Sequence, residues 1–192
     1  MGLEIKRSDT PKSIQKFLEK LLLPVLQGCT EQQFNAMIEE FVETSFADMA
    51  PWEKGSPKSV KDLSKYEYLH NQNANIGLSA KSKIRTPGHV TAAMNWNRLC
   101  DANNDKHSTR IIDGTRIIVC KLKPNPDGIT RIALPIDQHR IPKWFKNLDF
   151  DVSSMEDTIL EEKIRNIFEC TGFEIRVGSG GTHDALQQFF GM

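Results

Sequence analysis

The residues best suited to chemistry are cations and hydroxyl groups in two segments, 56–68 and 81–89. Lysines alternate with serines and tyrosines in the first segment, and the second adds lysines, an arginine, a threonine and a histidine. Such groups suit phosphates because they donate hydrogen bonds without demanding a particular base. Aromatic residues are sparse there, which disfavours the stacking of single-stranded bases. We therefore expect these segments to bind a nucleic-acid backbone, in duplex form and without much sequence preference.

The charge distribution along the chain agrees with an anionic partner on one side. The formal net charge is zero, with 25 basic and 25 acidic residues. Residues 12–53 hold seven acids and three bases, whereas residues 54–89 hold seven bases and two acids. A localised positive segment in a neutral chain is typical of a single phosphate-binding face. A solvated surface loop would have the same composition and stays open as the alternative.

The last eleven residues, THDALQQFFGM, carry a second motif. His183, Leu186, Phe189 and Phe190 fit HxxLxxFF, which is close to the QxxLxxFF box that inserts a helical turn into a pocket of a sliding clamp. One such turn places the leucine and the aromatic pair on the same side, as a compact interface anchor. Glycine and serine at 178–181 predict a flexible tether before it. The alternative is that these aromatic residues fold back onto the domain.

Signatures of catalytic centres are missing from the sequence. The acidic clusters at 39–43 and 161–162 fall within amphipathic helical patterns, where a solvated face explains them better than converging metal ligands. Glycine-rich phosphate loops, zinc spacings and hydrolase motifs do not occur, and His89 and His107 have no placed partner. We expect no catalytic residue, metal or cofactor in this chain. The four cysteines are at least 20 positions apart, and we expect them to be buried free thiols.

The composition is that of an ordinary globular chain. Hydrophobic residues make up 39% of the 192 residues, with three tryptophans and ten phenylalanines, which is enough for a core. Pro24 interrupts the longest apolar cluster, so no run reaches the roughly 18 residues of a membrane-spanning helix. The N-terminus lacks the apolar region of a signal peptide. We therefore expect a cytoplasmic protein without a membrane partner.

Hydrophobic spacing predicts two helices that pack as an antiparallel pair. Thr10 and Pro11 are typical of a helix start, with the threonine as cap and the proline at the first helical position. Proline and glycine within 24–28 close or kink this helix. Thr30 and Gln33 form a capping-box pattern that starts the second helix. The apolar positions expected to form the shared core are Ile14, Phe17, Leu18, Leu21, Leu22, Phe34, Met37, Ile38, Phe41 and Val42.

The pattern changes after the second helix. Residues 51–88 are rich in Pro, Gly, Ser, Asn and Lys, which predicts a basic loop region. A third helix is expected after Gly88, with Val90, Ala93, Met94 and Leu99 toward the core.

A small antiparallel sheet and a last helix complete the expected fold. β-branched runs at 111–112, 117–119 and 129–134 predict the strands, with a turn at 113–114. Ser154 begins a helical pattern that continues to about Cys170. The expected class is α+β and predominantly helical, followed by a flexible tail.

Several segments together resemble one protein family. MGLEIKRSDTPKSIQKFLEK is similar to the stretch that leaves the palm and starts the thumb of family B DNA polymerases, above all the replicative polymerases of large tailed bacteriophages. SVKDLSKYEY, TPGHVTAAMNWNRLC and IIDGTRIIVCKLK follow in the order of that thumb. LQQFFGM stands where the phage polymerase has its clamp-binding tail. The resemblance covers essentially the whole chain.

The resemblance implies a thumb domain over residues 1–177, then a tether and clamp-binding peptide over 178–192. Such a thumb wraps the new primer–template duplex from its minor-groove side. Lys6, Arg7 and Thr10 correspond to positions near the palm junction. The matching DNA-binding positions are Lys58, Ser59, Lys61, Ser64, Lys65, Tyr66, Lys83, Arg85, Thr86 and His89, and the clamp-binding positions are Leu186, Phe189 and Phe190.

The family's catalytic motifs are not in this chain. The DxxSLYP and YxDTDS stretches of the palm are missing, as is the lysine-tyrosine motif that precedes the thumb. The resemblance therefore implies either a fragment that begins at the palm–thumb junction or the downstream product of a polymerase gene split in two. Catalytic Mg²⁺ would belong to the missing palm. The implied partners are duplex DNA, a sliding clamp and the palm, fingers and exonuclease portion of the polymerase, in the cytoplasm of a bacterial host.

Two functions therefore remain in view. The first is processivity, in which the basic segments hold duplex DNA behind a polymerase active site and the tail tethers the enzyme to a clamp. The alternative is a standalone nucleic-acid-binding or adaptor protein that uses the helix pair as a protein interface. An independent hydrolase or transferase is disfavoured because no site for one is found.

Overall fold

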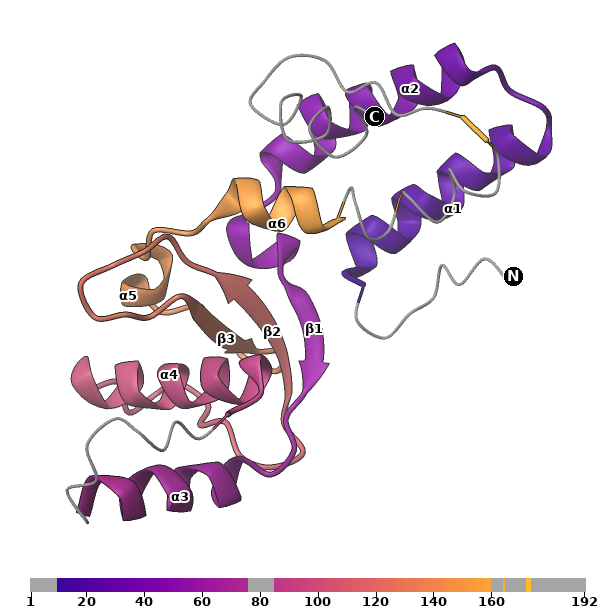
Figure 1. Cartoon of the computed structure of the whole chain (residues 1–192). Coiled ribbons are helices and arrows are strands. Elements are labelled where there is room, and N and C mark those ends of the chain that lie inside the picture. Colours follow the sequence, from indigo (N-terminus) through magenta and orange to yellow (C-terminus); the bar gives the residue numbers. More distant parts are fainter. Residues whose placement is uncertain (1–9, 76–84, 160–163, 165–171, 174–192) are drawn as a thin grey trace. The chain divides into compact units, whose positions relative to one another are not determined.

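The chain forms two compact units in a computed structural model that describes residues 10–75, 85–159, 164, 172 and 173 (Figure 1). One unit comprises 1–54 and 153–192 and is called here the helical unit; the other comprises 55–152 and is called the sheet unit. The predicted α+β class with a small antiparallel sheet is confirmed. The predicted boundary between residues 177 and 178 lies outside the described residues. None of the described helices is long and apolar enough to cross a membrane.

The helical unit begins with the predicted antiparallel pair. Helix α1 spans Lys12–Leu26 and helix α2 spans Glu31–Glu40, and α2 continues into a π-helical turn, Phe41–Phe46. The capping box at the start of α2 is confirmed, with Gln33 N donating to Thr30 Oγ1 at 3.2 Å and Thr30 N donating to Gln33 Oε1 at 2.9 Å. A short 3-10 turn, Pro51–Lys54, ends this first part of the unit.

The start of α1 differs from the prediction by one position. Pro11 is the capping residue and not the first helical residue, and no side chain caps the helix. Thr10 is buried, and its carbonyl oxygen accepts a bond from Gln15 Nε2 at 2.9 Å. Pro24 lies inside α1, so the helix ends only before Gly28, whose φ of +81° is readily adopted by glycine.

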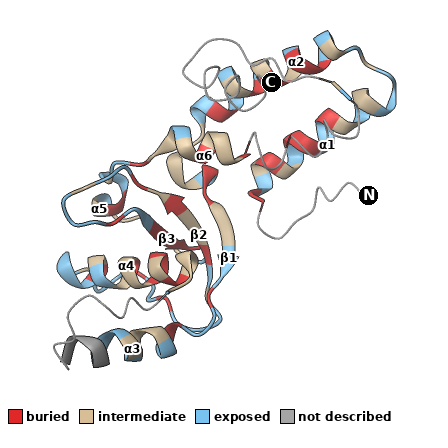
Figure 2. Cartoon of the chain, viewed as in Figure 1, coloured by how far each residue is buried: buried red, intermediate tan, exposed pale blue. Residues whose placement is uncertain are grey.

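The predicted apolar stripes form the core of the helical unit. Phe17 and Phe41 stack with ring centroids 3.7 Å apart, and Phe34 and Ile38 are fully buried. Met37 and Val42 are half-buried against this core, and Leu22 in α1 is half-buried. Helix α6, Val152–Ile159, contributes the buried side chain of Ile159 to this core, and Met155 of the same helix is also buried. It begins two residues before the predicted Ser154, and its predicted continuation to Cys170 lies mostly outside the described residues. The buried apolar residues are shown in red in Figure 2.

The sheet unit is built on three antiparallel strands in the order β1-β2-β3. Strand β1 spans Ser56–Ser59, β2 spans Arg116–Lys121 and β3 spans Arg131–Pro135. Helix α4, Gly88–Ala102, is the predicted third helix, and it packs on β2 and β3. Its buried residues are Val90, Ala92, Ala93, Trp96 and Cys100, whereas the predicted core residues Met94 and Leu99 are half-buried.

The prediction of a loop over residues 51–88 is wrong for much of the segment. It contains β1 and helix α3, Leu63–Asn75, which lies beside α4 (Figure 1). The polar run 70–75, expected to be loop, is the end of α3. Both elements depend on partners far along the chain, because β1 pairs with β2 and the side chain of Asp113 caps the start of α3. Partners so far along the chain leave no pattern in the sequence of β1 or α3 itself, so these two elements were not predicted.

The prediction of a strand at 111–112 is also wrong. Ile111 is buried, but its main chain bonds to the side chain of Asn97 in α4, with Asn97 Nδ2 donating to Ile111 O at 2.8 Å and Ile111 N donating to Asn97 Oδ1 at 3.0 Å. These bonds replace a strand ladder. The third strand of the sheet is β1 instead.

The cysteines agree with the expectation of free thiols where the structure describes them. Cys100 and Cys120 are buried and Cys29 is half-buried, all three as free thiols, and Cys170 lies outside the described residues. Burial raises the pKa of Cys100 to about 11 and that of Cys120 to about 12. These two thiols are therefore protonated and unreactive at neutral pH.

Candidate nucleic-acid interface

Strand β1 and the start of α3 position the first group of predicted DNA-binding residues. Lys58 and Ser59 are exposed on β1, which is an edge strand paired only with β2 in the sheet. Val60 then turns inward, since its side chain is fully buried and its N–H donates to Thr115 O at 2.9 Å. Lys61 and Lys65 are exposed on either side of the buried Leu63. A buried residue on each side of Lys61 thus fixes the path of a basic surface segment.

Asp113 fixes the first turn of α3 from 50 residues away. Its Oδ1 accepts from Leu63 N at 2.5 Å, and its Oδ2 accepts from Ser64 Oγ at 2.6 Å and from Ser64 N at 3.3 Å. The bond from the Ser64 hydroxyl, followed by that from Leu63 N–H, lowers the pKa of Asp113. A carboxylate at a helix N-terminus also suits the helix dipole. The hydroxyl hydrogen of Ser64 is therefore directed at Asp113. In the free protein, Ser64 thus helps to position α3.

The start of α4 brings the second predicted segment to the same region. Arg85 is exposed, and Thr86 is half-buried, with its Oγ1 2.9 Å from His70 Nε2 in α3. Burial lowers the pKa of His89, and the charge of Lys58 on β1 lowers it further. His89 is therefore mostly neutral at pH 7. Residues about 30 positions apart in the sequence thus share one electrostatic environment.

Two arginines that the sequence analysis did not identify join this surface. Arg116 is exposed on β2 directly opposite Ser59 of β1. Arg131, at the start of β3, lies over Gly88, and a Cβ placed on Gly88 would come within 1.9 Å of Arg131 Nη1. A glycine at the first residue of α4 therefore allows the guanidinium to approach the helix end. The only signal in the sequence was Gly88 itself, since both arginines are remote in the chain.

We call this group the β1 surface. Its members come from five elements and flanking loops of one compact unit, so their relative positions are set by that unit alone. Asp62 is exposed next to Lys61, so the surface is not purely basic. The members are Lys58, Ser59, Lys61, Lys65, Arg85, His89, Arg116 and Arg131.

The remaining predicted residues have different outcomes. Tyr66 is half-buried, with Lys65 Nζ 6.0 Å from its ring centroid. Lys83 lies outside the described residues, as do Lys6 and Arg7. So do the clamp-binding residues Leu186, Phe189 and Phe190. Their assignment stays a prediction.

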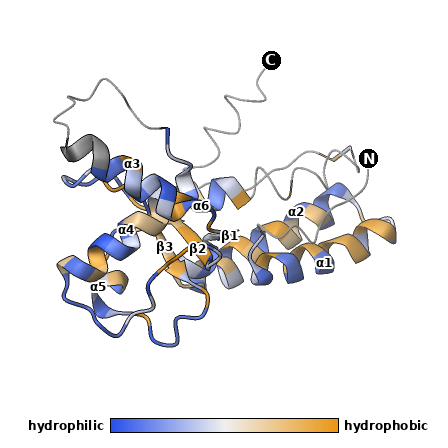
Figure 3. Cartoon of the chain, turned by 90° about the horizontal axis from the view of Figure 1, so that it is seen from below, coloured by the Kyte–Doolittle hydropathy of each residue, from blue (hydrophilic) through white to orange (hydrophobic). Residues whose placement is uncertain are grey.

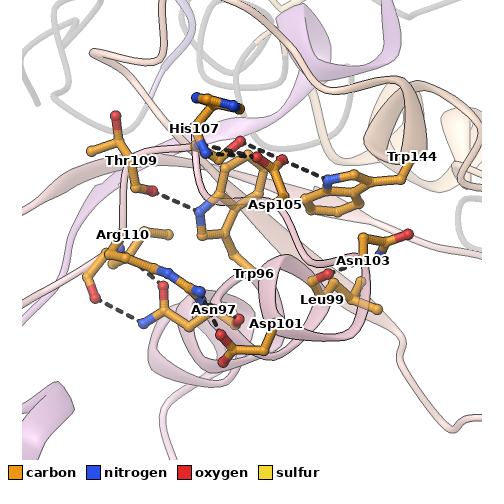
Figure 4. A network of polar contacts seen from close by, with 12 residues as sticks. Trp96, Asn97, Leu99, Asp101, Asn103, Asp105, His107, Thr109, Arg110 and Trp144 are labelled. Carbon is orange, nitrogen blue, oxygen red and sulfur yellow. Dashed lines mark hydrogen bonds and ion pairs between the residues drawn. The ribbon is translucent and has the colours of Figure 1, made fainter.

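A polar network at the other end of α4 holds the loop that follows the helix (Figure 4). Asp105 accepts four hydrogen bonds, from the N–H groups of His107 and Ser108, from Ser108 Oγ at 2.7 Å and from Trp144 Nε1 at 2.9 Å. The side-chain bonds from Ser108 and Trp144 are the main reason that its pKa falls to about 2. Nearby, Trp96 Nε1 donates to Thr109 O, and Arg110 pairs with Asp101.

The network has no feature of a catalytic centre. Its donors and acceptors satisfy one another, and no buried side-chain N or O atom in the described part of the chain is without a partner. The described residues also hold no cluster of three or more His, Cys, Asp or Glu side chains arranged to bind a metal ion. We conclude that this network is structural.

The chain matches no protein-family model, and no curated protein is significantly similar to it in sequence. The function must therefore be argued from the residues and their placement.

Proposed function

We propose that the chain is the C-terminal, thumb part of a DNA-directed DNA polymerase, which holds primer–template duplex through its backbone and is tethered to a sliding clamp. The observation that carries the DNA-binding half of this proposal is the β1 surface. Of the segments chosen from sequence for their cations, 56–68 and 81–89, residues 56–68 and the described residues 85–89 lie together on one unit, and two more arginines join them. A solvated loop would give no reason for this convergence.

The chemistry of the β1 surface supports a backbone contact and not a base contact. Its exposed groups are ammonium and guanidinium ions with a serine hydroxyl and an imidazole, which suit phosphate oxygens. In α3, Tyr66 is half-buried beside Lys65, and Tyr68 is a single exposed aromatic residue. Stacking on a row of exposed aromatic rings, which single-stranded binding uses, has no counterpart here. Affinity should therefore be electrostatic and largely independent of sequence.

The first test is fluorescence anisotropy of the full chain with a labelled blunt duplex and a single strand of equal length, over a series of salt concentrations. We expect preference for the duplex and a steep loss of affinity with salt, because each phosphate contact adds about 0.9 to the slope. Binding to neither strand form at low salt would contradict the proposed DNA contact.

Single substitutions then locate the contact. Lys65→Ala and Arg85→Ala should each weaken binding similarly for unrelated sequences and reduce the salt slope by about one. Lys123→Ala is the matched control, because Lys123 is exposed in the same unit and pairs with Asp149 at 3.1 Å. A loss that depends on DNA sequence, or an equal loss in the control, would contradict the assignment.

Gly88→Ala separates binding from stability. The added methyl group would displace the guanidinium of Arg131, which is the movable end of a long side chain. Alanine also favours a helix more than glycine does. We expect unchanged or increased thermal stability with weaker duplex binding. If the variant binds duplex as tightly as the wild type, Arg131 does not belong to the β1 surface.

Protonation of His89 gives a further test. Burial and Lys58 lower its pKa in the free protein, whereas a bound phosphate would favour the protonated imidazole and raise it. Duplex binding should therefore strengthen as the pH falls through the pKa of the complex, with uptake of a proton. His89→Asn should remove this dependence, and a variant that retains it would show that another group is responsible.

The clamp tether rests on the HxxLxxFF motif alone, because its residues lie outside the described part of the chain. Deleting residues 186–192 should abolish binding to a clamp and leave duplex binding unchanged. An unchanged affinity for the clamp would contradict the tether. The reading frame upstream in the same genome tests the polymerase itself, since palm motifs with paired aspartates are expected there.

One observation favours the alternative, an adaptor that uses the helix pair. Leu23 and Leu26 in α1 are 59% and 76% exposed, in a helix whose opposite side forms a core. Exposed leucines near each other are typical of contact surfaces. This alternative gains if the upstream reading frame is unrelated to polymerases and the chain does not bind duplex DNA. Leu23→Ser and Leu26→Ser should then abolish binding of a protein partner that the wild-type chain binds.

A further inference from the structure

A second group of cations lies at the opposite end of α4 from the β1 surface. Lys106 follows the helix in the loop held by Asp105, and Arg140 and Lys143 lie before and at the start of the short helix α5, Lys143–Lys146. All three side chains are exposed, and within the described part of the chain they form no ion pair. We call this group, with Lys146, His107 and His139, the α5 surface.

Side-chain bonds bring the two segments of the α5 surface together. Trp144 Nε1 donates to Asp105, and this bond ties α5 to the loop that carries Lys106. Gln138 reaches the same loop, because its Oε1 accepts from Thr109 N at 2.8 Å and its Nε2 lies 3.3 Å from Ser108 Oγ. Gln138 Nε2 also donates to Arg140 O at 2.8 Å. The main chain under these cations is thus fixed before any ligand binds, which lowers the ordering cost of binding.

The acidic residues near this surface do not neutralise it. Segments 103–110 and 137–147 contain five lysines and arginines and two aspartates. Asp105 is already occupied by four hydrogen bonds, and Asp137 is exposed beside Gln138. Arg110 pairs with Asp101, so it adds little positive charge. In Figure 3 the loops next to α5 have hydrophilic colours. The surface therefore attracts anions.

We propose that the α5 surface binds phosphates of the same duplex that the β1 surface holds, so that the sheet unit contacts DNA at both ends of α4. This inference rests on the proposed function and adds a second contact. Helix α4 has 15 residues and is therefore about 20 Å long. A duplex covers that distance in about six base pairs, at one charge per 1.7 Å of axis. Both ends of α4 can thus contact one duplex, provided that the duplex is longer than this.

The test measures the affinity of the full chain for DNA hairpins with stems of about 5 and about 14 base pairs, since only the longer stem can reach both surfaces. The variant Lys106→Ala/Arg140→Ala/Lys143→Ala should bind the long stem about tenfold more weakly, as expected for three exposed charge contacts. Its salt slope should fall by about one per lost contact, and its affinity for the short stem should be unchanged. The matched control is Lys12→Ala/Lys16→Ala/Lys20→Ala, which removes three exposed lysines from the other unit.

The possible outcomes separate this inference from the proposed function. If the α5-surface variant binds the long stem as the wild type does, while Lys58→Ala/Lys61→Ala/Lys65→Ala does not, the second contact is wrong and the first stands. If wild-type protein binds neither stem, the proposed function itself fails. If the α5-surface variant loses the same affinity for both stems, the two-ended contact is also wrong. The same holds if the variant binds both stems normally but loses affinity for a labelled acidic peptide, used as a second anionic probe.

Discussion

The helical unit and the sheet unit differ in what holds their elements in place. In the helical unit, apolar side chains from α1, α2 and α6 form the core, and the start of α2 is capped by residues three positions apart. In the sheet unit, polar side chains bond to main chain that is distant in the sequence. Asn97 holds Ile111, and Asp113 caps α3 at Leu63. The cap of α2 is encoded by neighbouring residues, whereas the contacts that place Ile111 and the start of α3 are not.

This difference explains why the two candidate surfaces lie where they do. The β1 surface and the α5 surface are both carried by segments that long-range polar bonds position, namely the start of α3 and the loop after α4. Such bonds fix loops without covering them, so that cations on the loops stay exposed. An apolar core would bury the same residues instead.

The largest effect is expected from substitutions that destabilise the core of one unit and leave the core of the other intact. Trp96 is fully buried in the sheet unit, 5.1 Å from Trp144 and 5.5 Å from Phe145 between ring centroids. Trp96→Ala should lower the free energy of unfolding of that unit by about 3–5 kcal/mol. Amide hydrogen exchange should show loss of protection in β2 and β3 but not in α1 and α2. Phe34→Ala should give the reverse pattern, and uniform loss in either variant would mean that the units unfold as one.

The next largest loss of stability is expected at Gly55, the first residue of the sheet unit. A Cβ there would lie 2.5 Å from Ile118 Cγ2 and 2.8 Å from Val119 O, and the carbonyl cannot move without disturbing β2. Gly55→Ala should destabilise the sheet unit by about 2 kcal/mol and loosen the pairing of β1. Gly128→Ala is the control, because its Cβ would meet no atom within 4 Å and its cost is only that of a φ of +67°. Equal effects on β1 amides would contradict a steric cause.

Acid should weaken the sheet unit through Asp105. Its pKa is lowered from 3.8 to about 2 in the folded state, so its stabilising effect is present above pH 3.8 and is lost as the pH falls toward 2. Asp105→Asn keeps one acceptor oxygen and should cost about 1 kcal/mol at pH 6, because much of the group is solvated. Urea unfolding followed by tryptophan fluorescence should show a smaller difference between variant and wild type at pH 2. If the difference in stability between variant and wild type is the same at pH 6 and pH 2, the charge of the Asp105 carboxylate is not its cause.

An effect no larger than that of Asp105→Asn is expected at the local cap of the helical unit. Thr30→Ala removes the acceptor for Gln33 N and should cost about 1 kcal/mol, confined to that unit. Hydrogen exchange of the first α2 amides is the measurement, with Thr115→Ala in the sheet unit as a comparison for a hydroxyl that accepts from Ile112 N. Faster exchange in β2 or β3 of the Thr30 variant would show that the two units are coupled.

Periodicity and capping signals predicted the elements whose partners are local. The helix pair, α4 and the strands β2 and β3 follow from apolar spacing, and the capping box of Thr30 and Gln33 was found directly. Strand β1 and helix α3 were missed because their partners lie about 50 to 60 residues away. The same reason hid Arg116 and Arg131 from the candidate interface, whereas the lysines of 56–66 were found by type alone.

Strand β1 has a further property as the edge of its sheet. An edge strand exposes main-chain groups to which a strand of another molecule can add, and this is a common start of aggregation. Pro57 has no N–H to offer, and Lys58 places an exposed charge beside it. Both are features that block such addition. Neutralising the edge, as in a lysine-to-alanine variant, would therefore weaken DNA binding and at the same time favour self-association at high protein concentration.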